Sequence, residues 1–210
     1  MGISPWNQRF FATTRGQLIL LLRRASQTVE ELAQALHLTD NAVRAHLATL
    51  ERDGLVEQQG VRRGSGKPAF VYALTPEAER LFPKAYEPVL DQLLGVLEAQ
   101  RPPEQIEELL RVTGRQLAKT RPLPVGDLRA RLHAATETLN SLGGLAVLEE
   151  TEEFFWIRGQ RCPLAALVPD HPQMCQLAEA LVGQLIGESV QEHCARGAEP
   201  HCCFAIAKTI

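Results

Sequence analysis

Three short amphipathic helical segments in the first third of the chain constrain its fold most. The second of them begins at Thr28-Val-Glu-Glu31, a Ser/Thr-x-x-Glu capping box that satisfies the first free N–H groups of a helix. In the third, Val43, Leu47 and Leu50 recur at i, i+4 and i+7, which predicts one buried stripe. The pattern predicts helices over residues 14–25, 28–36 and 39–52.

A strand–turn–strand pattern follows these helices. Val56–Val61 and Ala69–Leu74 are predicted strands, and the basic, glycine-rich segment Arg62–Pro68 joins them. Thr75-Pro76 is then expected to open a further helix. Three helices and a hairpin with a basic tip are typical of a winged helix-turn-helix, so we predict such a domain over residues 10–82.

The exposed positions of the third helix suit contact with DNA bases. Asn and Arg side chains make two-point hydrogen bonds to adenine and guanine in the major groove. A basic turn with glycines approaches phosphates or the minor groove closely. The candidate DNA-contacting residues are Thr39, Asp40, Asn41, Arg44, Ala45 and His46 in the helix, and Arg62, Arg63 and Lys67 in the turn. A solvated surface helix is the alternative for any one of them.

Charge and hydropathy limit the other classes of function. Residues 1–80 carry ten Lys/Arg and eight Asp/Glu, a net charge of +2. Residues 81–210 carry twelve Lys/Arg and seventeen Asp/Glu, a net charge of −5. No apolar run approaches the roughly 20 residues of a membrane span, and the first residues lack the apolar core of a signal peptide. We therefore expect a cytoplasmic protein without a membrane partner.

The remaining chain divides at the linker Pro122–Pro124. Before it, residues 83–121 form a leucine-rich helical segment that is a candidate dimer seam; the alternative is that it covers the winged helix. After it, residues 125–210 alternate helices and strands, which predicts a small α+β domain. Helices are expected over 127–142 and 171–186, and strands over 145–149, 154–158, 189–193 and 202–207. The predicted class is thus mainly α with an α+β sensor domain.

All five cysteines lie in this last domain, at Cys162, Cys175, Cys194, Cys202 and Cys203. In a reducing compartment, clustered thiols indicate metal or cluster ligands, or a redox sensor, more than a disulfide framework. Their spacing lacks Cys-x-x-Cys, so the ligands must come from several elements. Cys202 and Cys203 are neighbours on a predicted strand and point to opposite faces, so only one of them should enter a given site.

Two resemblances accompany these patterns. Leu38–Val56, with the turn at Arg63–Pro68 and the strand Tyr72–Thr75, resembles the recognition helix and wing of ArsR and DeoR-type repressors. The stretch Arg161–Cys175, with the terminal Cys202-Cys203, resembles the sensor half of SufR-type repressors of iron–sulfur cluster biosynthesis. That resemblance implies that Cys162, Cys175 and one of Cys202 or Cys203 hold a [4Fe–4S] cluster. It also implies a homodimer whose affinity for a double-stranded DNA operator depends on the cluster.

The alternatives remain open at this point. Zinc can take the same thiolates, with His171, His193 or His201 as a substitute ligand. The thiols can also form a metal-free disulfide switch or pack as small apolar side chains. A regulator with a structural zinc and an organic effector near Phe154–Trp156 is the second function considered. No nucleophile–base pair, phosphate-binding glycine loop or His-Glu-x-x-His motif is present, so an enzyme is not expected.

Overall fold

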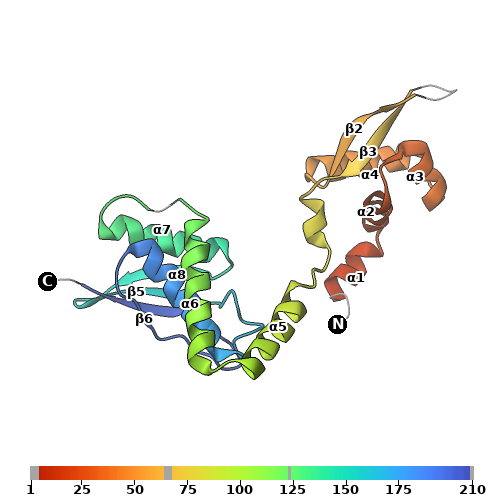
Figure 1. The fold of residues 1–210 in the computed structure, drawn as a ribbon. Helices are drawn as coiled ribbons and strands as arrows, with labels where there is room; N and C mark the ends of the chain where they lie inside the picture. The colour runs from red at the N-terminus through yellow and green to blue at the C-terminus, as the bar shows by residue number, and fades with distance from the viewer. Residues whose placement is uncertain (1–4, 64–67, 123, 209–210) are drawn as a thin grey trace. The chain divides into compact units, whose positions relative to one another are not determined.

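A computed structural model describes residues 5–63, 68–122 and 124–208 (Figure 1). It divides the chain into two compact units, Met1–Lys84 and Ala85–Ile210. No helix among the described residues is long and apolar enough to cross a bilayer.

Within residues 5–63 and 68–84, four α-helices and a small sheet make up the first unit. The helices are α1 (Pro5–Phe11), α2 (Thr14–Arg24), α3 (Val29–Leu36) and α4 (Asp40–Arg52). The capping box is confirmed: the Thr28 amide donates to Glu31 Oε2 at 2.7 Å, and the Glu31 amide donates to Thr28 Oγ1 at 3.3 Å. His37 ends α3 in the left-handed region at φ 55°, and Thr39 caps α4 through the Ala42 amide.

The predicted buried stripe packs the helices together. Val43, Leu47 and Leu50 of α4 are at most 1% exposed and lie in one core with Leu18 and Leu32. The hairpin is also confirmed, as β2 (Val56–Arg62) pairs antiparallel with β3 (Ala69–Leu74). The unit is therefore a winged helix-turn-helix.

The first unit differs from the prediction in three places. A short strand, β1 (Gln27–Thr28), adds to the sheet in the order β1-β3-β2, and α1 precedes the predicted helices. The helix expected after Thr75 is only a 3₁₀ turn, η1 (Ala78–Leu81). Thr75 nonetheless accepts the Ala78 amide as an N-cap does, and also donates to the Gly54 carbonyl.

The described part of the second unit, residues 85–122 and 124–208, combines four α-helices with an antiparallel sheet. The helices are α5 (Tyr86–Gln100), α6 (Pro103–Lys119), α7 (Leu128–Ser141) and α8 (Cys175–Ile186); the strands are β4 (Ala146–Glu150), β5 (Phe154–Gly159), β6 (Gln191–Glu192) and β7 (Cys203–Ala207). The sheet order is β4-β5-β7-β6. The predicted last helix is split, because the 3₁₀ turn η2 (Pro172–Met174) precedes α8 and leaves Cys175 as its first residue.

One hydrophobic core lies between the sheet and two helices. Ile157 and Phe204 on the inner face of the sheet pack against Leu132 of α7 and Leu181 of α8, and all four are nearly or fully inaccessible. Helix α6 then packs on α8, as Figure 1 shows. Their approach is closest at Gly114, where a Cβ atom would lie 2.2 Å from the Leu177 carbonyl oxygen.

A second core attaches α5 and the segment between the first two cysteines. Leu94 of α5 and Leu110 of α6 are buried with Leu167, Val168 and Met174 of that segment. Cys175 belongs to this core, and Cys162 and Cys194 border both cores. The thiols therefore lie where the sheet core meets the core that holds α5.

Candidate metal centre and DNA-reading helix

Four of the five thiols approach one another from separate segments. Cys162 follows β5 in a loop, Cys175 begins α8, Cys194 follows β6, and Cys202 precedes β7. The thiols interact in neighbouring pairs, each thiol affecting the pKa of the other: Cys175 with Cys194, Cys194 with Cys202, and Cys202 with Cys162. Cys175 and Cys202 are buried, while Cys162 and Cys194 are partly exposed. The arrangement gathers soft, metal-binding sulfurs at one place.

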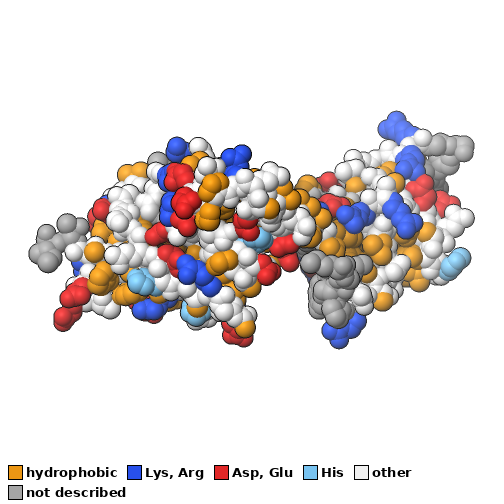
Figure 2. Space-filling model, turned by 60° about the horizontal axis from the view of Figure 1, so that its bottom comes forward, with side chains coloured by type: hydrophobic (Ala, Val, Ile, Leu, Met, Phe, Trp, Pro, Cys, Tyr) orange, Lys and Arg blue, Asp and Glu red, His pale blue; other side chains and the backbone are white. Residues whose placement is uncertain are grey.

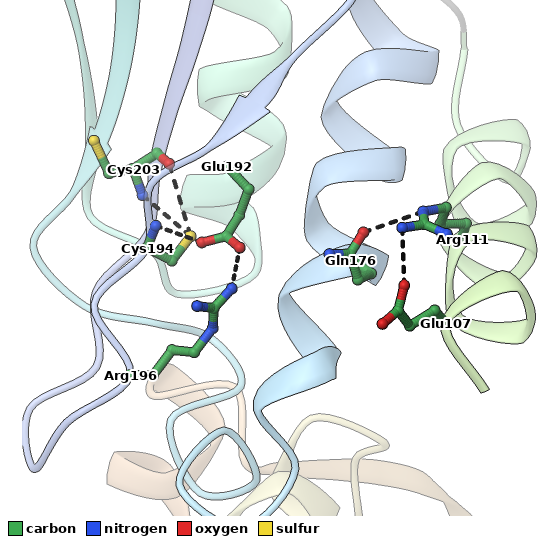
Figure 3. A network of polar contacts seen from close by, with 7 residues as sticks. All are labelled: Glu107, Arg111, Gln176, Glu192, Cys194, Arg196 and Cys203. Atoms are coloured by element: carbon green, nitrogen blue, oxygen red, sulfur yellow. Dashed lines mark hydrogen bonds and ion pairs between the residues drawn. The ribbon is translucent and has the colours of Figure 1, made fainter. Parts of the chain in front are cut away.

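Cys203 lies apart from these four thiols. Figure 3 shows its side chain pointing away from Cys194, although its backbone contacts that residue: the Cys203 amide donates to Cys194 Sγ at 3.3 Å. On the outer face of the sheet its sulfur instead accepts from Arg158 at 3.5 Å. Burial raises the pKa of Cys203, and the Arg158 guanidinium opposes that rise. The expected alternation of Cys202 and Cys203 is therefore confirmed.

Glu192 places a carboxylate oxygen beside two of the thiols. Within residues 5–63, 68–122 and 124–208, the group of three ligand atoms within 4.8 Å of one another comprises Cys175 Sγ, Cys194 Sγ and a Glu192 oxygen. Glu192 accepts the Cys194 amide at 2.5 Å and pairs with Arg196 (Figure 3). Cys175 and Cys194 can thus bind a metal ion.

The thiols differ in how readily they ionise. Interaction with the Cys202 thiol lowers the pKa of Cys162, and the Leu164 amide, 3.4 Å from its sulfur, adds to this effect. The interaction with the Cys162 thiol raises the pKa of Cys202 to about 12, and burial adds to this rise. Contact with Cys194 and burial raise the pKa of Cys175 far above its usual range, and Arg196 opposes them. Cys162 is therefore the thiol most easily converted to a thiolate ligand.

Cys194 stands between these extremes. Cys175 favours its thiolate, but the neighbouring Cys202 thiol and burial outweigh that effect and raise its pKa. Three thiols thus hold their protons until a metal displaces them, so binding at this site must release protons.

The three histidines considered as substitute ligands are engaged elsewhere. Both ring nitrogens of His171 face carboxylates of α5: Nδ1 lies 2.7 Å from Glu98 and Nε2 lies 3.3 Å from Asp91. The His193 ring lies 5.5 Å from the Trp156 ring on the outer face of the sheet, and His201 is exposed. A histidine ligand is therefore not supported by these positions.

The aromatic residues considered for an effector pocket are divided between the two sheet faces. Phe155 is buried in the core, while Phe154 and Trp156 lie on the outer face with ring centroids 5.9 Å apart. Arg158 covers the Trp156 ring at 4.5 Å. They do not line a common cavity.

Helix α4 presents the residues that were predicted to read DNA. Thr39, Asp40, Asn41, Arg44 and Ala45 are exposed, and His46 is half-buried at the flank. Val43 and Leu47 of the same helix are buried in the core, so the face of α4 that carries the exposed residues points outward. The outward face therefore carries the exposed amide of Asn41 and the exposed guanidinium of Arg44.

The basic residues predicted to contact DNA from the wing do not all have free side chains. Arg62 donates to Glu31 Oε1 at 2.6 Å, so its guanidinium is held against the start of α3. Arg63 is exposed, and Lys67 lies outside the described residues. Figure 2 shows separate basic side chains rather than one merged patch on the face in view.

The comparison with known families decides the class of this unit. Residues 13–58, from the cap of α2 to the start of β2, match the family described as "Bacterial regulatory protein, arsR family". The chain carries an arsR-family DNA-binding domain. This match supports a transcriptional regulator that binds double-stranded DNA through this domain. No curated protein matches the sequence.

Sequence patterns missed two features of this regulator. Glu192 is not among the predicted ligands, although it lies two residues before Cys194; its approach to Cys175 depends on the fold. The carboxylates Asp91 and Glu98 were not linked to His171, some 70 to 80 residues away in the chain. The spacing of Asp91 and Glu98 by seven residues, two helical turns, was the available signal.

Proposed function

We propose that this arsR-family regulator senses iron–sulfur status through a [4Fe–4S] cluster held by Cys162, Cys175, Cys194 and Cys202. The observation that carries the proposal is the convergence of these four thiols, with Cys203 directed away. The resemblance of Arg161–Cys175 and the terminal cysteines to SufR-type repressors supports it. Four thiolates are the usual ligand set of such a cluster.

The spread of the thiols favours a cluster over one zinc ion bound by all four. Zn–S bonds are about 2.3 Å long, so two sulfurs on one zinc lie at most about 4.6 Å apart. In the part of the chain that the structure describes, the ligand atoms of Cys175, Cys194 and Glu192 lie within 4.8 Å of one another, but Cys162 and Cys202 are not members of this group. A larger polynuclear group accommodates ligands that are farther apart.

The residues around the site would tune the bound group. A cluster supplies one-electron redox chemistry and a reversible link between the segments that bind it. Arg196 favours the thiolate of Cys175, and the amides of Leu164 and Cys203 donate toward Cys162 and Cys194. These donors offset the negative charge that four thiolates bring into a half-buried site.

The DNA-reading half of the proposal places α4 in the major groove. Asn41 and Arg44 are the side chains we assign to base edges, and Arg63 to the phosphate backbone. In a homodimer, two such helices would reach half-sites about one helical turn, ~34 Å, apart.

Helix α5 supplies the face that we assign to dimerisation. Tyr86, Val89, Leu93 and Val96 are 51–78% exposed and follow each other at spacings of three, four and three residues. This is the a/d pattern of a two-stranded helical seam. The flanking positions Gln92 and Ala99 are uncharged, so a second copy meets no like-charge repulsion there.

The attachment of α5 to the thiol site provides the coupling. The segment between Cys162 and Cys175 holds α5 through the core around Leu94 and through the buried His171 between Asp91 and Glu98. Ligand binding at both ends of that segment would fix its position, and loss of the ligand would release it. A shift of α5 would then alter the dimer seam and the spacing of the two reading helices.

The alternative function is an effector-responsive regulator with a structural zinc. The trio Cys175, Cys194 and Glu192 favours it, because these atoms already lie within the span of a single ion. A cavity of about 470 Å³ lined by Arg101, Gln176 and Arg196, among others, would take the effector.

Anaerobic purification with metal and sulfide analysis separates the two. A broad visible band with stoichiometric iron and sulfide, lost in Cys162→Ser and Cys202→Ser and retained in Cys203→Ser, is expected for the cluster. One zinc per chain, retained in Cys162→Ser and lost in Glu192→Gln, would instead establish the alternative.

Operator binding tests the regulatory half of the proposal. Cluster-loaded and cluster-free protein should differ in operator affinity by about 5–150-fold, the usual range of allosteric coupling. Arg44→Ala should weaken specific binding by about 1–3 kcal/mol, whereas the matched Arg80→Ala, on a 78% exposed side chain outside α4, should leave it unchanged. Equal affinities of loaded and cluster-free protein would refute the switch.

A further inference from the structure

An apolar cavity ends on two of the thiols. It has a volume of about 170 Å³, and all ten residues that line it are Leu, Ala, Pro or Cys. The walls include Leu117 of α6, Leu139 and Leu142 at the end of α7, and Leu177 of α8, with Cys162 and Cys202 at the sulfur edge. Leu142 is 37% exposed, so it lies where the cavity meets solvent.

We propose that this cavity is a binding port through which small, uncharged, apolar molecules reach the Cys162–Cys202 edge of the thiol site. Cavities of about 150 Å³ with such walls remain dry and bind benzene or xenon. A charged or strongly polar molecule would lose its hydration without gaining a partner, because the walls offer no side-chain amide, hydroxyl or carboxylate. Molecules from a diatomic gas to a small hydrocarbon fit both the size and the chemistry.

The position of the cavity gives the port its selectivity. Cys175 and Cys194 do not line it, and Cys203 lies on the other face of the sheet. The Leu164 amide holds Cys162 Sγ at 3.4 Å, so that sulfur keeps a defined orientation at the edge. A molecule entering beside Leu142 therefore meets Cys162 and Cys202 before the other thiols. The inference deepens the proposed function, because it names the class of molecule that reaches the sensing site.

The test uses metal-free, reduced protein, so it does not depend on any cluster. Methyl methanethiosulfonate and its sulfonatoethyl analogue carry the same reactive group: the thiolate takes the S-alkyl group as a mixed disulfide, and methanesulfinate leaves. Only the second reagent is charged. Peptide mass spectrometry gives the rate at each cysteine. We expect the neutral reagent to modify Cys162 at least tenfold faster than the charged reagent.

Variants of the entrance make the test specific. Leu142→Trp should slow the neutral reagent at Cys162 at least fivefold, and Leu142→Ala should accelerate it, with the Cys203 rate unchanged as an internal reference. Val147→Trp, at a 47% exposed position on β4 that does not line the cavity, is the matched control and should change nothing. Far-UV circular dichroism verifies that each variant is folded.

Competition distinguishes the two sizes of ligand. Protection of Cys162 by dissolved benzene would support a port for small organic molecules. Protection by xenon alone would support a port restricted to gas-sized molecules. Equal rates for the two reagents, or a Leu142→Trp protein that reacts like the parent, would overturn the inference while leaving the proposed cluster untouched. Conversely, a protein that contains zinc and no iron, but in which the neutral reagent still reacts faster at Cys162 and is slowed by Leu142→Trp, would refute the cluster and leave the port supported.

Discussion

Gly114 and Gly95 form a matched pair that tests the packing around the thiol site. Both are in helix interiors, where alanine is favoured over glycine by about 1 kcal/mol. At Gly95 nothing lies within 4 Å of an added Cβ, whereas at Gly114 that atom would lie 2.2 Å from the Leu177 carbonyl oxygen. The same substitution should therefore stabilise the protein at one site and destabilise it at the other.

The size of the effect follows from the clash. Ordinary van der Waals contact needs about 3.5 Å, so Gly114→Ala forces α6 and α8 apart by about 1 Å. Since the obstacle is backbone, rotamer changes cannot relieve it, and overpacking costs about 3 kcal/mol. After the gain in helix propensity, a net loss of about 2 kcal/mol remains. Gly95→Ala should gain up to about 1 kcal/mol.

Thermal unfolding measures both changes. In a Trp6→Phe background, fluorescence of Trp156 on β5 reports on the second unit alone. We expect Tm to fall by roughly 8 °C for Gly114→Ala and to rise by roughly 3 °C for Gly95→Ala. Because α8 begins at Cys175, Gly114→Ala should also weaken metal retention. A Gly114→Ala protein at least as stable as the parent would refute the described contact between α6 and α8.

Two further predictions concern the cap of α3 and the clamp on α5. Thr28→Ala removes the hydroxyl that accepts the Glu31 amide; it should cost about 1 kcal/mol and speed hydrogen exchange across α3 about fivefold, and unchanged exchange would contradict the cap. Although burial opposes it, contact with Glu98 and Asp91 raises the pKa of His171 above 6.5. The charged clamp therefore stabilises the fold in full below about pH 6.5, and this contribution is lost as pH rises through the folded-state pKa. Urea midpoints should fall between pH 6 and 8 more steeply in the parent than in His171→Gln, and parallel profiles would exclude the clamp.

The winged helix was predictable because its determinants are local. The capping box at Thr28 and the buried stripe at Val43 and Leu47 each act within a few residues along the chain. Helix capping and helix periodicity therefore specify these helices without long-range contacts. The boundaries were less predictable, and the helix expected after Thr75 is only a 3₁₀ turn.

In the second unit, the sequence indicated which residues could bind a metal but not how they are arranged in space. The clustering of five thiols and the alternation that separates Cys202 from Cys203 follow from composition and strand geometry. The approach of Cys194 and Glu192 to Cys175, the carboxylates around His171 and the apolar cavity beside Cys162 join residues far apart in the chain. Only tertiary packing brings such residues together, because their distances depend on how α5, α6 and α8 pack against the sheet and not on any local preference.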